Sequence, residues 1–150
     1  IGLYNKEAFA VENKLNNILN DNEKNGVFVG LPKFLSEVMI KGSYIIPKIN
    51  TNGVKKILLN IFTLQQMLRN VMNDAESVNF TKPSVYYELF TKHEQEFLEI
   101  VKRNHLKFTS KEIQNLVRLL YSEKLADGRG SSFHKSKFSE LERKITEILT

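Results

Sequence analysis

The stretch from Asn50 to Val71 constrains the fold of this chain more than any other. Its apolar residues recur every three or four positions, which places them on one stripe of an α-helix at about 100° per residue. They are Val54, Ile57, Leu58, Ile61, Leu64, Leu68, Val71 and Met72. Lysines and asparagines occupy the other side. The pattern predicts one long helix, from about Asn52 to Met72, that buries a single face.

Five further segments have the same helical period, and no segment indicates a convincing strand. The first covers about Tyr4–Leu19 and the second about Leu31–Ile46. The next starts near Lys82 with a stripe that reaches Val101, another opens at Thr109 with Tyr121 on its face, and the last carries apolar residues from Phe138 to Leu149. Connections of about 5–11 residues between such segments favour antiparallel neighbours. The predicted fold class is therefore all-α, an up-and-down bundle of about six helices. We expect residues 1–150 to form a single domain.

Local signals place the beginnings of two of these helices. Thr81 is a candidate N-cap, and Pro83 suits the first helical turn. Thr109 and Glu112 have the spacing of a capping box, in which each side chain accepts a hydrogen bond from the backbone N–H of the other residue.

The first two predicted helices each have an apolar face. In the first helix it comprises Tyr4, Ala8, Val11, Leu15, Ile18 and Leu19, and in the second Phe34, Leu35, Val38 and Met39. Gly42 and Pro47 predict an irregular end to the second helix.

Composition excludes several classes of protein. Hydrophobic residues make up 41% and charged residues 26% of the chain, as in ordinary globular domains. The absence of cysteine excludes a disulfide scaffold and a cysteine-ligated metal centre. No stretch approaches the roughly 18 apolar residues of a membrane span. The chain begins at Ile1 without a signal-like leader, and we expect it to be a fragment of a longer chain.

The positive charge is concentrated in the last third. Residues 1–100 hold 11 Lys/Arg and 11 Asp/Glu, whereas residues 101–150 hold 11 and 6, which is the whole excess of +5. The cations that could form a surface for an anionic partner are Lys102, Arg103, Lys107, Lys111, Arg143 and Lys144. Two interpretations stay open: a solvated lysine-rich surface, which we favour, and a surface for an acidic protein, phosphoinositide headgroups or nucleic acid.

No motif indicates catalysis. His93 and Glu94 begin like a zinc-protease helix, but Phe97 stands where the second histidine is required. Glu94 and Glu96 are two residues apart and so point to different faces of a helix. We therefore predict no enzymatic activity, no catalytic or cofactor-binding residues, no bound metal, no cofactor and no small-molecule substrate.

Two polar residues lie within predicted apolar stripes. Gln65 falls between Ile61 and Leu68, and His93 falls between Phe90 and Phe97. In an antiparallel hairpin formed across residues 73–81, they would lie about one helical turn apart in depth. A buried polar group needs a partner. We therefore predict that Gln65 and His93 form a buried hydrogen-bonded pair with a structural role and no chemical one.

Several segments resemble a known family. Gly53–Ile57 and Asn60–Gln66 form a basic-then-apolar run ending in Leu-Gln-Gln, and Tyr86–Phe90 is similar to a Tyr-Tyr-Glu-Met-Leu stretch. Lys107, Phe108 and Thr109 are followed by Glu112 and by Leu116, Leu119 and Leu120, as in a similar leucine-rich run. Across about residues 50–125 the chain resembles the C-terminal region of exocyst complex component four. The matching residues are packing positions and mark no site.

The resemblance implies a non-catalytic helical module in a complex that tethers secretory vesicles to the plasma membrane before fusion. It implies one C-terminal bundle within a longer rod of stacked bundles, with other exocyst subunits as partners. It also implies a cytoplasmic location, peripheral at plasma-membrane sites of secretion. The alternative is a basic module that binds a phosphoinositide membrane or nucleic acid, although we expect no nucleic acid partner. Salt-dependent binding to anionic vesicles or to RNA and DNA would distinguish this alternative from the exocyst module.

Overall fold

The computed structural model describes residues 6–11, 13–14, 28–126 and 131–150. Its labelled α-helices are α3 (Leu31–Gly42), α4 (Thr51–Val71), α5 (Thr81–Glu88), α6 (Glu94–Arg103), α7 (Ser110–Ala126) and α8 (Ser131–Leu149). Three short 3-10 helices connect them: η1 (Ser43–Ile45), η2 (Ala75–Ser77) and η3 (Leu89–Thr91). No strand forms within the described ranges, so the all-α prediction is confirmed.

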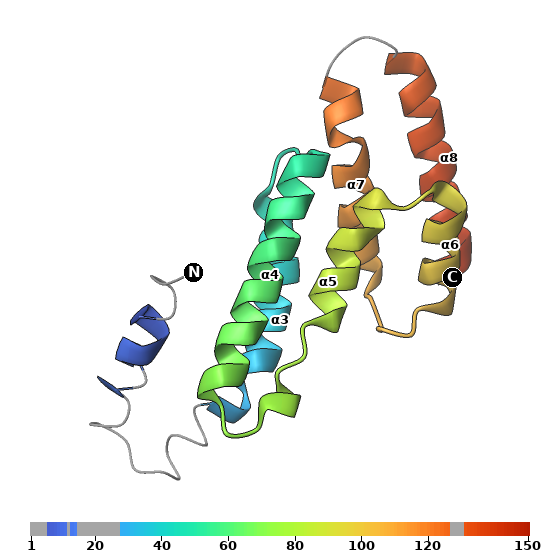
Figure 1. Ribbon diagram of the computed structural model, residues 1–150. Helices are drawn as coiled ribbons and strands as arrows, with labels where there is room; N and C mark the ends of the chain where they lie inside the picture. The colour runs from blue at the N-terminus through green and yellow to red at the C-terminus, as the bar shows by residue number, and fades with distance from the viewer. Residues whose placement is uncertain (1–5, 12, 15–27, 127–130) are drawn as a thin grey trace.

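The helices alternate in direction along the chain. Figure 1 shows that α3, α5 and α7 run one way and that α4, α6 and α8 run the other. α4 packs against α5, α7 packs against α8, and α6 lies along α8. The predicted helical bundle is confirmed.

One hydrophobic core runs through the bundle. On α4, Val54, Ile61 and Leu68 are buried at intervals of seven residues, or about two helical turns. The other members of the predicted stripe on α4 are half-buried and pack against this core. The predicted helix and its buried face are therefore confirmed.

Side chains of α4 fix both of its ends. Asn50 is the N-cap, and its side-chain oxygen accepts a hydrogen bond of 2.9 Å from the backbone N–H of Gly53. Near the other end, the Gln65 side chain accepts a 2.8 Å hydrogen bond from the backbone N–H of Phe80. Arg69 donates to the backbone oxygen of Val78 at 3.2 Å. These two bonds hold the connection to α5 against α4.

The single helix predicted over Lys82–Val101 is wrong. The structure divides it into α5, η3 and α6, because the backbone is extended at Lys92 and His93, with ψ of 150° and 154°. A new helix begins there with Glu94 and Glu96 in its first turn, where negative charge is favoured by the helix dipole. The predicted N-cap at Thr81 is also wrong, because Phe80 occupies that position without a side-chain cap bond.

The predicted face of the second helix is confirmed in part. Leu35 and Met39 are half-buried and pack against the core, whereas Phe34 and Val38 are 62% and 44% exposed and Ile40 is buried at 1%. The buried Ser43 continues the inward face just after α3 ends, which fixes its rotation. In the first predicted helix, residues 6–11 and 13–14 are helical, and Val11 is exposed. The other predicted face residues of that helix, except the half-buried Ala8, lie outside the described residues.

The predicted capping box at the start of α7 is confirmed. The backbone N–H of Thr109 donates to the Glu112 carboxylate at 2.8 Å, and the N–H of Glu112 donates to the Thr109 hydroxyl at 3.2 Å. α7 then forms a hairpin with α8, in which the rings of Tyr121 and Phe138 meet edge to face at 5.5 Å. The two surfaces described next lie at opposite ends of this hairpin.

Candidate interaction surfaces

The six cations singled out from the sequence do not form one surface. Lys144 lies 2.9 Å from both Glu94 and Glu140, and Arg143 pairs with Glu147. The hydrogen bond and charge of Lys144 lower the pKa of the Glu140 carboxyl. The two cations of α8 are therefore neutralised by neighbouring carboxylates.

The other four cations gather at the turn between α6 and α7. Arg103 lies 3.8 Å from Glu99, whereas Lys102, Lys107 and Lys111 form no ion pair with any described residue. All four are exposed. We call Lys102, Arg103, Lys107 and Lys111 the basic turn.

Asn104 builds the backbone of the basic turn. It ends α6 in the left-handed conformation, with φ of 41°, which asparagine tolerates well. Its side-chain amide donates to the backbone oxygen of Phe108 at 3.0 Å and accepts from the N–H of the same residue at 2.7 Å. Lys107 follows with φ of 53°. Two specific backbone bonds thus fix the shape of the loop that carries the lysines.

The predicted buried pair of Gln65 and His93 is wrong. His93 is exposed, because it is the N-cap of α6 at the break after η3. Gln65 is half-buried, and its oxygen accepts a hydrogen bond from Phe80. The error follows from the assumption that one continuous helix carries His93 past Gln65 in register.

Four separate segments enclose a groove of about 490 Å³ at the end of the α7–α8 hairpin that lies away from the basic turn. The N-terminus of α4, the η3–α6 connection, the middle of α7 and the first turns of α8 contribute to it. Its lining comprises Ile49, Asn50, Thr51, Val54, Phe90, Thr91, Lys92, His93, Glu94, Phe97, Leu120, Tyr121, Phe133, His134, Lys137 and Leu141. We call this cavity the α4–α8 groove.

The groove combines an apolar floor with a polar rim. Val54, Phe97 and Leu141 belong to the buried core and form the floor. On the rim, Phe133 is 59% exposed, and the Lys137 ammonium lies 4.9 Å from the centre of its ring. A cation over the face of an aromatic ring is attracted by the ring quadrupole. Of the polar residues that line this groove, the sequence had drawn attention to His93 and Glu94, and for other reasons.

A buried polar cluster joins α3, α5 and α7 behind these surfaces. Ser43 is fully buried, and Asn115 donates to its hydroxyl at 2.7 Å and to the Tyr86 hydroxyl at 3.1 Å. Arg118 closes the cluster by donating to the backbone oxygen of Ile46 at 3.0 Å. Burial raises the pKa of Tyr86, so its hydroxyl stays protonated as a donor. The cluster is satisfied internally and offers no open site.

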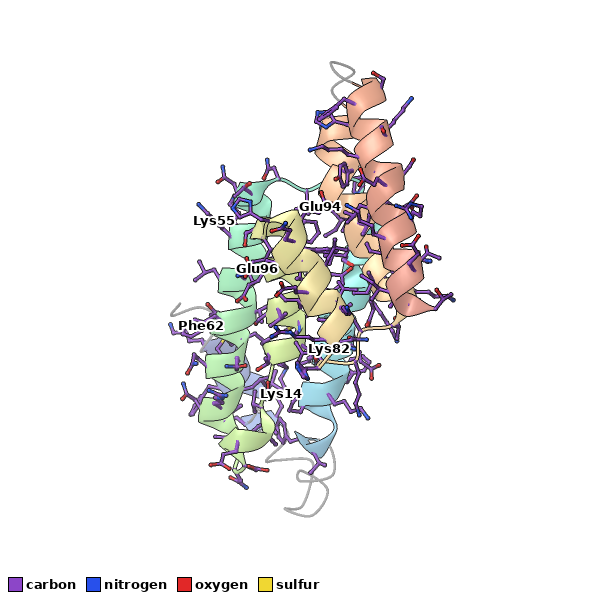
Figure 2. All side chains as sticks on the ribbon, turned by 90° about the vertical axis from the view of Figure 1, so that its right-hand side faces the viewer. Lys14, Lys55, Phe62, Lys82, Glu94 and Glu96 are labelled. Carbon is purple, nitrogen blue, oxygen red and sulfur yellow. The ribbon has the colours of Figure 1, made fainter. Side chains whose placement is uncertain are left out.

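Large apolar side chains also remain on the outer surface. Phe34 and Val38 project from α3, and Leu59 and Phe62 project from α4, where they are 64% and 59% exposed. Figure 2 shows Phe62 on the outer side of α4, pointing away from the other helices. Exposed apolar side chains of this size can be buried against a neighbouring protein, and they mark a contact where they form one patch.

The described residues do not assemble a metal centre. Among them, no three His, Cys, Asp or Glu side chains are grouped closely enough to hold a metal ion. Nor does any helix in the part of the chain that the structure describes combine the length and apolarity needed to cross a membrane. The features of this surface are therefore grooves, charges and exposed apolar side chains, which suit binding to other molecules.

Known proteins that match this chain carry a common name. Human exocyst complex component 4 is 30% identical to it over 125 residues, which cover 83% of this chain. The Dictyostelium discoideum protein of the same name is 30% identical over 91 residues, and a probable exocyst complex component of Neurospora crassa is 32% identical over 95 residues. The chain is homologous to one segment of the exocyst complex component 4 proteins. No family model matches it.

This homology confirms the resemblance seen in the motif segments. The chain spans 13% of the length of the human protein and 8% of the Dictyostelium and Neurospora proteins, so it corresponds to one segment of them. The segments that carried the resemblance include the buried Ile61, Tyr86 and Leu116. That the matched segment lies at the C-terminal end of these related proteins stays a prediction.

Proposed function

We propose that this chain is a non-catalytic structural and interaction module of the exocyst complex. In this role it forms one C-terminal bundle of a longer rod, presents surface to other exocyst subunits and contributes to tethering secretory vesicles at the plasma membrane. It acts in the cytoplasm and is peripheral at sites of secretion. The observation that carries the proposal is the 30% identity over 83% of the chain to human exocyst complex component 4.

Two features of the surface support a module that makes contacts. Exposed apolar side chains such as Phe34 and Leu59 gain from burial against a neighbour, at about 25 cal/mol per Å² of apolar area removed from water. The folded chain also carries an apolar-floored groove and a basic turn at opposite ends of the α7–α8 hairpin. A rod of stacked bundles needs contacts at its ends and along its sides.

The test is reconstitution with the other exocyst subunits. The tagged chain is mixed with purified subunits, and the complex is separated by size-exclusion chromatography. Co-elution with at least one identified exocyst subunit is expected. Elution of the folded chain alone, under conditions in which the subunits assemble with one another, would contradict the proposal. An unrelated basic helical bundle serves as the control for charge-driven association.

The second candidate function is binding to an anionic membrane, and the basic turn favours it. Lys102, Lys107 and Lys111 lack ion-pair partners among the described residues, and Asn104 holds their loop in one shape. Each lysine near an anionic surface contributes about 1 kcal/mol. Three lysines alone give weak attraction, so we favour a solvated surface.

Vesicle sedimentation separates these two functions. Weak binding to phosphoinositide vesicles is expected, with little change when Lys102, Lys107 and Lys111 are replaced by glutamate. Strong sedimentation that falls steeply with added salt and is abolished by the three substitutions would support the membrane-binding module instead. A parallel measurement with RNA and DNA distinguishes a nucleic acid partner.

A further inference from the structure

Most of the charged side chains around the α4–α8 groove form ion pairs, but not all of them do. Lys92 is held by Glu96 at 2.7 Å, and Glu94, the acidic residue that lines the groove, is held by Lys144 at 2.9 Å. Lys137 forms no ion pair with any described residue. Among the described residues that line the groove, Lys137 is therefore a cation without an ion pair, and Glu94, the one carboxylate, is already paired.

Two histidines also line the groove, and each imidazole ring carries an N–H donor. His93 is exposed and His134 is half-buried, and both line the groove. The His134 ring contacts the Phe133 ring edge to face at 5.6 Å. A negatively charged group entering beside Phe133 would therefore meet Lys137 and the neighbouring His134 ring, and the ring of His93 offers a further N–H donor in the lining.

The groove also offers apolar surface to a partner. Val54, Phe97 and Leu141 at its floor are only 1–2% exposed, whereas Phe133 on the rim is 59% exposed, so the apolar area open to a partner lies on the rim and upper walls. A volume of about 490 Å³ falls within the roughly 300–1,000 Å³ of known ligand sites. A small anion would find no donors on this floor, and a flat membrane surface could not reach it.

We propose that the α4–α8 groove binds an acidic amphipathic helix of a partner protein. One of its apolar side chains enters beside Phe133 onto the floor, and one of its carboxylates pairs with Lys137. The inference deepens the proposed function and rests on it, because it names the chemistry by which a sister subunit is held. Charge complementarity selects the partner, and the exposed Phe133 ring supplies the main apolar contact.

The experiment uses two synthetic peptides of about 15 residues, long enough to form a helix on binding. Both have leucines at helical spacing on one face, and the other face carries glutamates in one peptide and lysines in the other. Fluorescence anisotropy measures the affinity of each peptide for the folded chain. The glutamate peptide is expected to bind, with the lysine peptide weaker by about tenfold or more.

Matched variants locate the binding. Lys137→Glu is expected to weaken the glutamate peptide about tenfold, and Phe133→Ser about fivefold. Lys135→Glu makes the same charge change on an exposed residue of α8 outside the groove. Phe62→Ser removes a phenyl ring that is also 59% exposed, but on α4. Both controls should change the affinity less than about twofold.

Several outcomes would overturn the inference. They are tighter binding of the lysine peptide, an equal loss from Lys135→Glu and Lys137→Glu, no binding of the glutamate peptide up to about 1 mM, and a specific loss of vesicle binding in Lys137→Glu. Reconstitution with exocyst subunits separates this failure from that of the proposed function. If the groove variants still capture the same subunits fully, the groove inference fails and the proposed function stands. If the chain binds the peptide through the groove but captures no subunit, the proposed function fails.

Discussion

The hydroxyl oxygens of Ser43 and Tyr86 lie 3.0 Å apart in the interior, although 43 residues separate them in the chain. Both side chains are fully buried, and Asn115 donates to both oxygens from α7. Tyr86 also donates to the backbone oxygen of Glu112 at 3.2 Å. Three helices are therefore joined at one point by hydrogen bonds between largely buried groups, so the cluster fixes how these helices meet.

Tyr86→Phe tests the contribution of this cluster to stability. The substitution keeps the ring but removes the hydroxyl, which leaves the Glu112 backbone oxygen without that donor. We expect the free energy of unfolding in urea to fall by about 1–3 kcal/mol. The control is Tyr44→Phe, because Tyr44 is 41% exposed and its hydroxyl forms no hydrogen bond within the described residues. An equal loss of unfolding free energy in Tyr44→Phe would show that the hydrogen bonds of Tyr86 stabilise the fold no more than an exposed hydroxyl does.

Ile61→Ala tests the buried stripe of α4. Ile61 is 3% exposed in the middle of the longest helix, so the substitution leaves a cavity in the core. Urea unfolding should show a loss of about 2–5 kcal/mol. Lys56→Ala, at an exposed position of the same helix, should change stability by less than about 0.5 kcal/mol. Similar losses in the two variants would be incompatible with the observed rotation of α4.

The sequence alone is sufficient where the determinants are local. The helix ending near Val71 follows from periodicity within one segment, and the box formed by Thr109 and Glu112 follows from two residues three positions apart. Both patterns act within a few turns of chain, so no other part of the molecule is needed to interpret them.

Features that join distant segments could not be predicted in this way. Periodicity suggested one helix through His93, but the chain turns there so that α6 can pack along α8. The rotation of α3 depends on Ser43 meeting Tyr86, and the α4–α8 groove needs four segments to come together. One local signal was available for the groove: Phe133 and Lys137 are four residues apart and so share a helix face.

The stability of the bundle should fall at high pH because of Tyr87. Burial raises the pKa of its hydroxyl from 10.0 to about 12, and the hydroxyl donates to the backbone oxygen of Met39 at 2.8 Å. Between about pH 10 and 12 the unfolded chain therefore loses this proton while the folded chain keeps it, which favours unfolding as the pH rises. The loss attributable to Tyr87 should reach about 2–3 kcal/mol.

Urea unfolding at a series of pH values measures this effect. Tyr87→Phe is less stable at neutral pH, because it lacks the bond to Met39, but its stability should decline less steeply above about pH 10. Parallel curves for the two proteins across this range would mean that Tyr87 does not control the alkaline transition.

Gln65→Leu should destabilise the connection between α4 and α5. The Gln65 oxygen accepts the backbone N–H of Phe80, a residue with no exposed surface, so the substitution leaves a buried donor without its partner. We expect a loss of about 1–3 kcal/mol in urea unfolding. His93→Leu changes an exposed residue and should cost less than about 0.5 kcal/mol. Because the two side chains do not bond to each other, the double variant should show the sum of the two effects to within about 0.5 kcal/mol. A coupling energy above about 1 kcal/mol would indicate a direct interaction between Gln65 and His93 and would contradict the position of His93 at the start of α6.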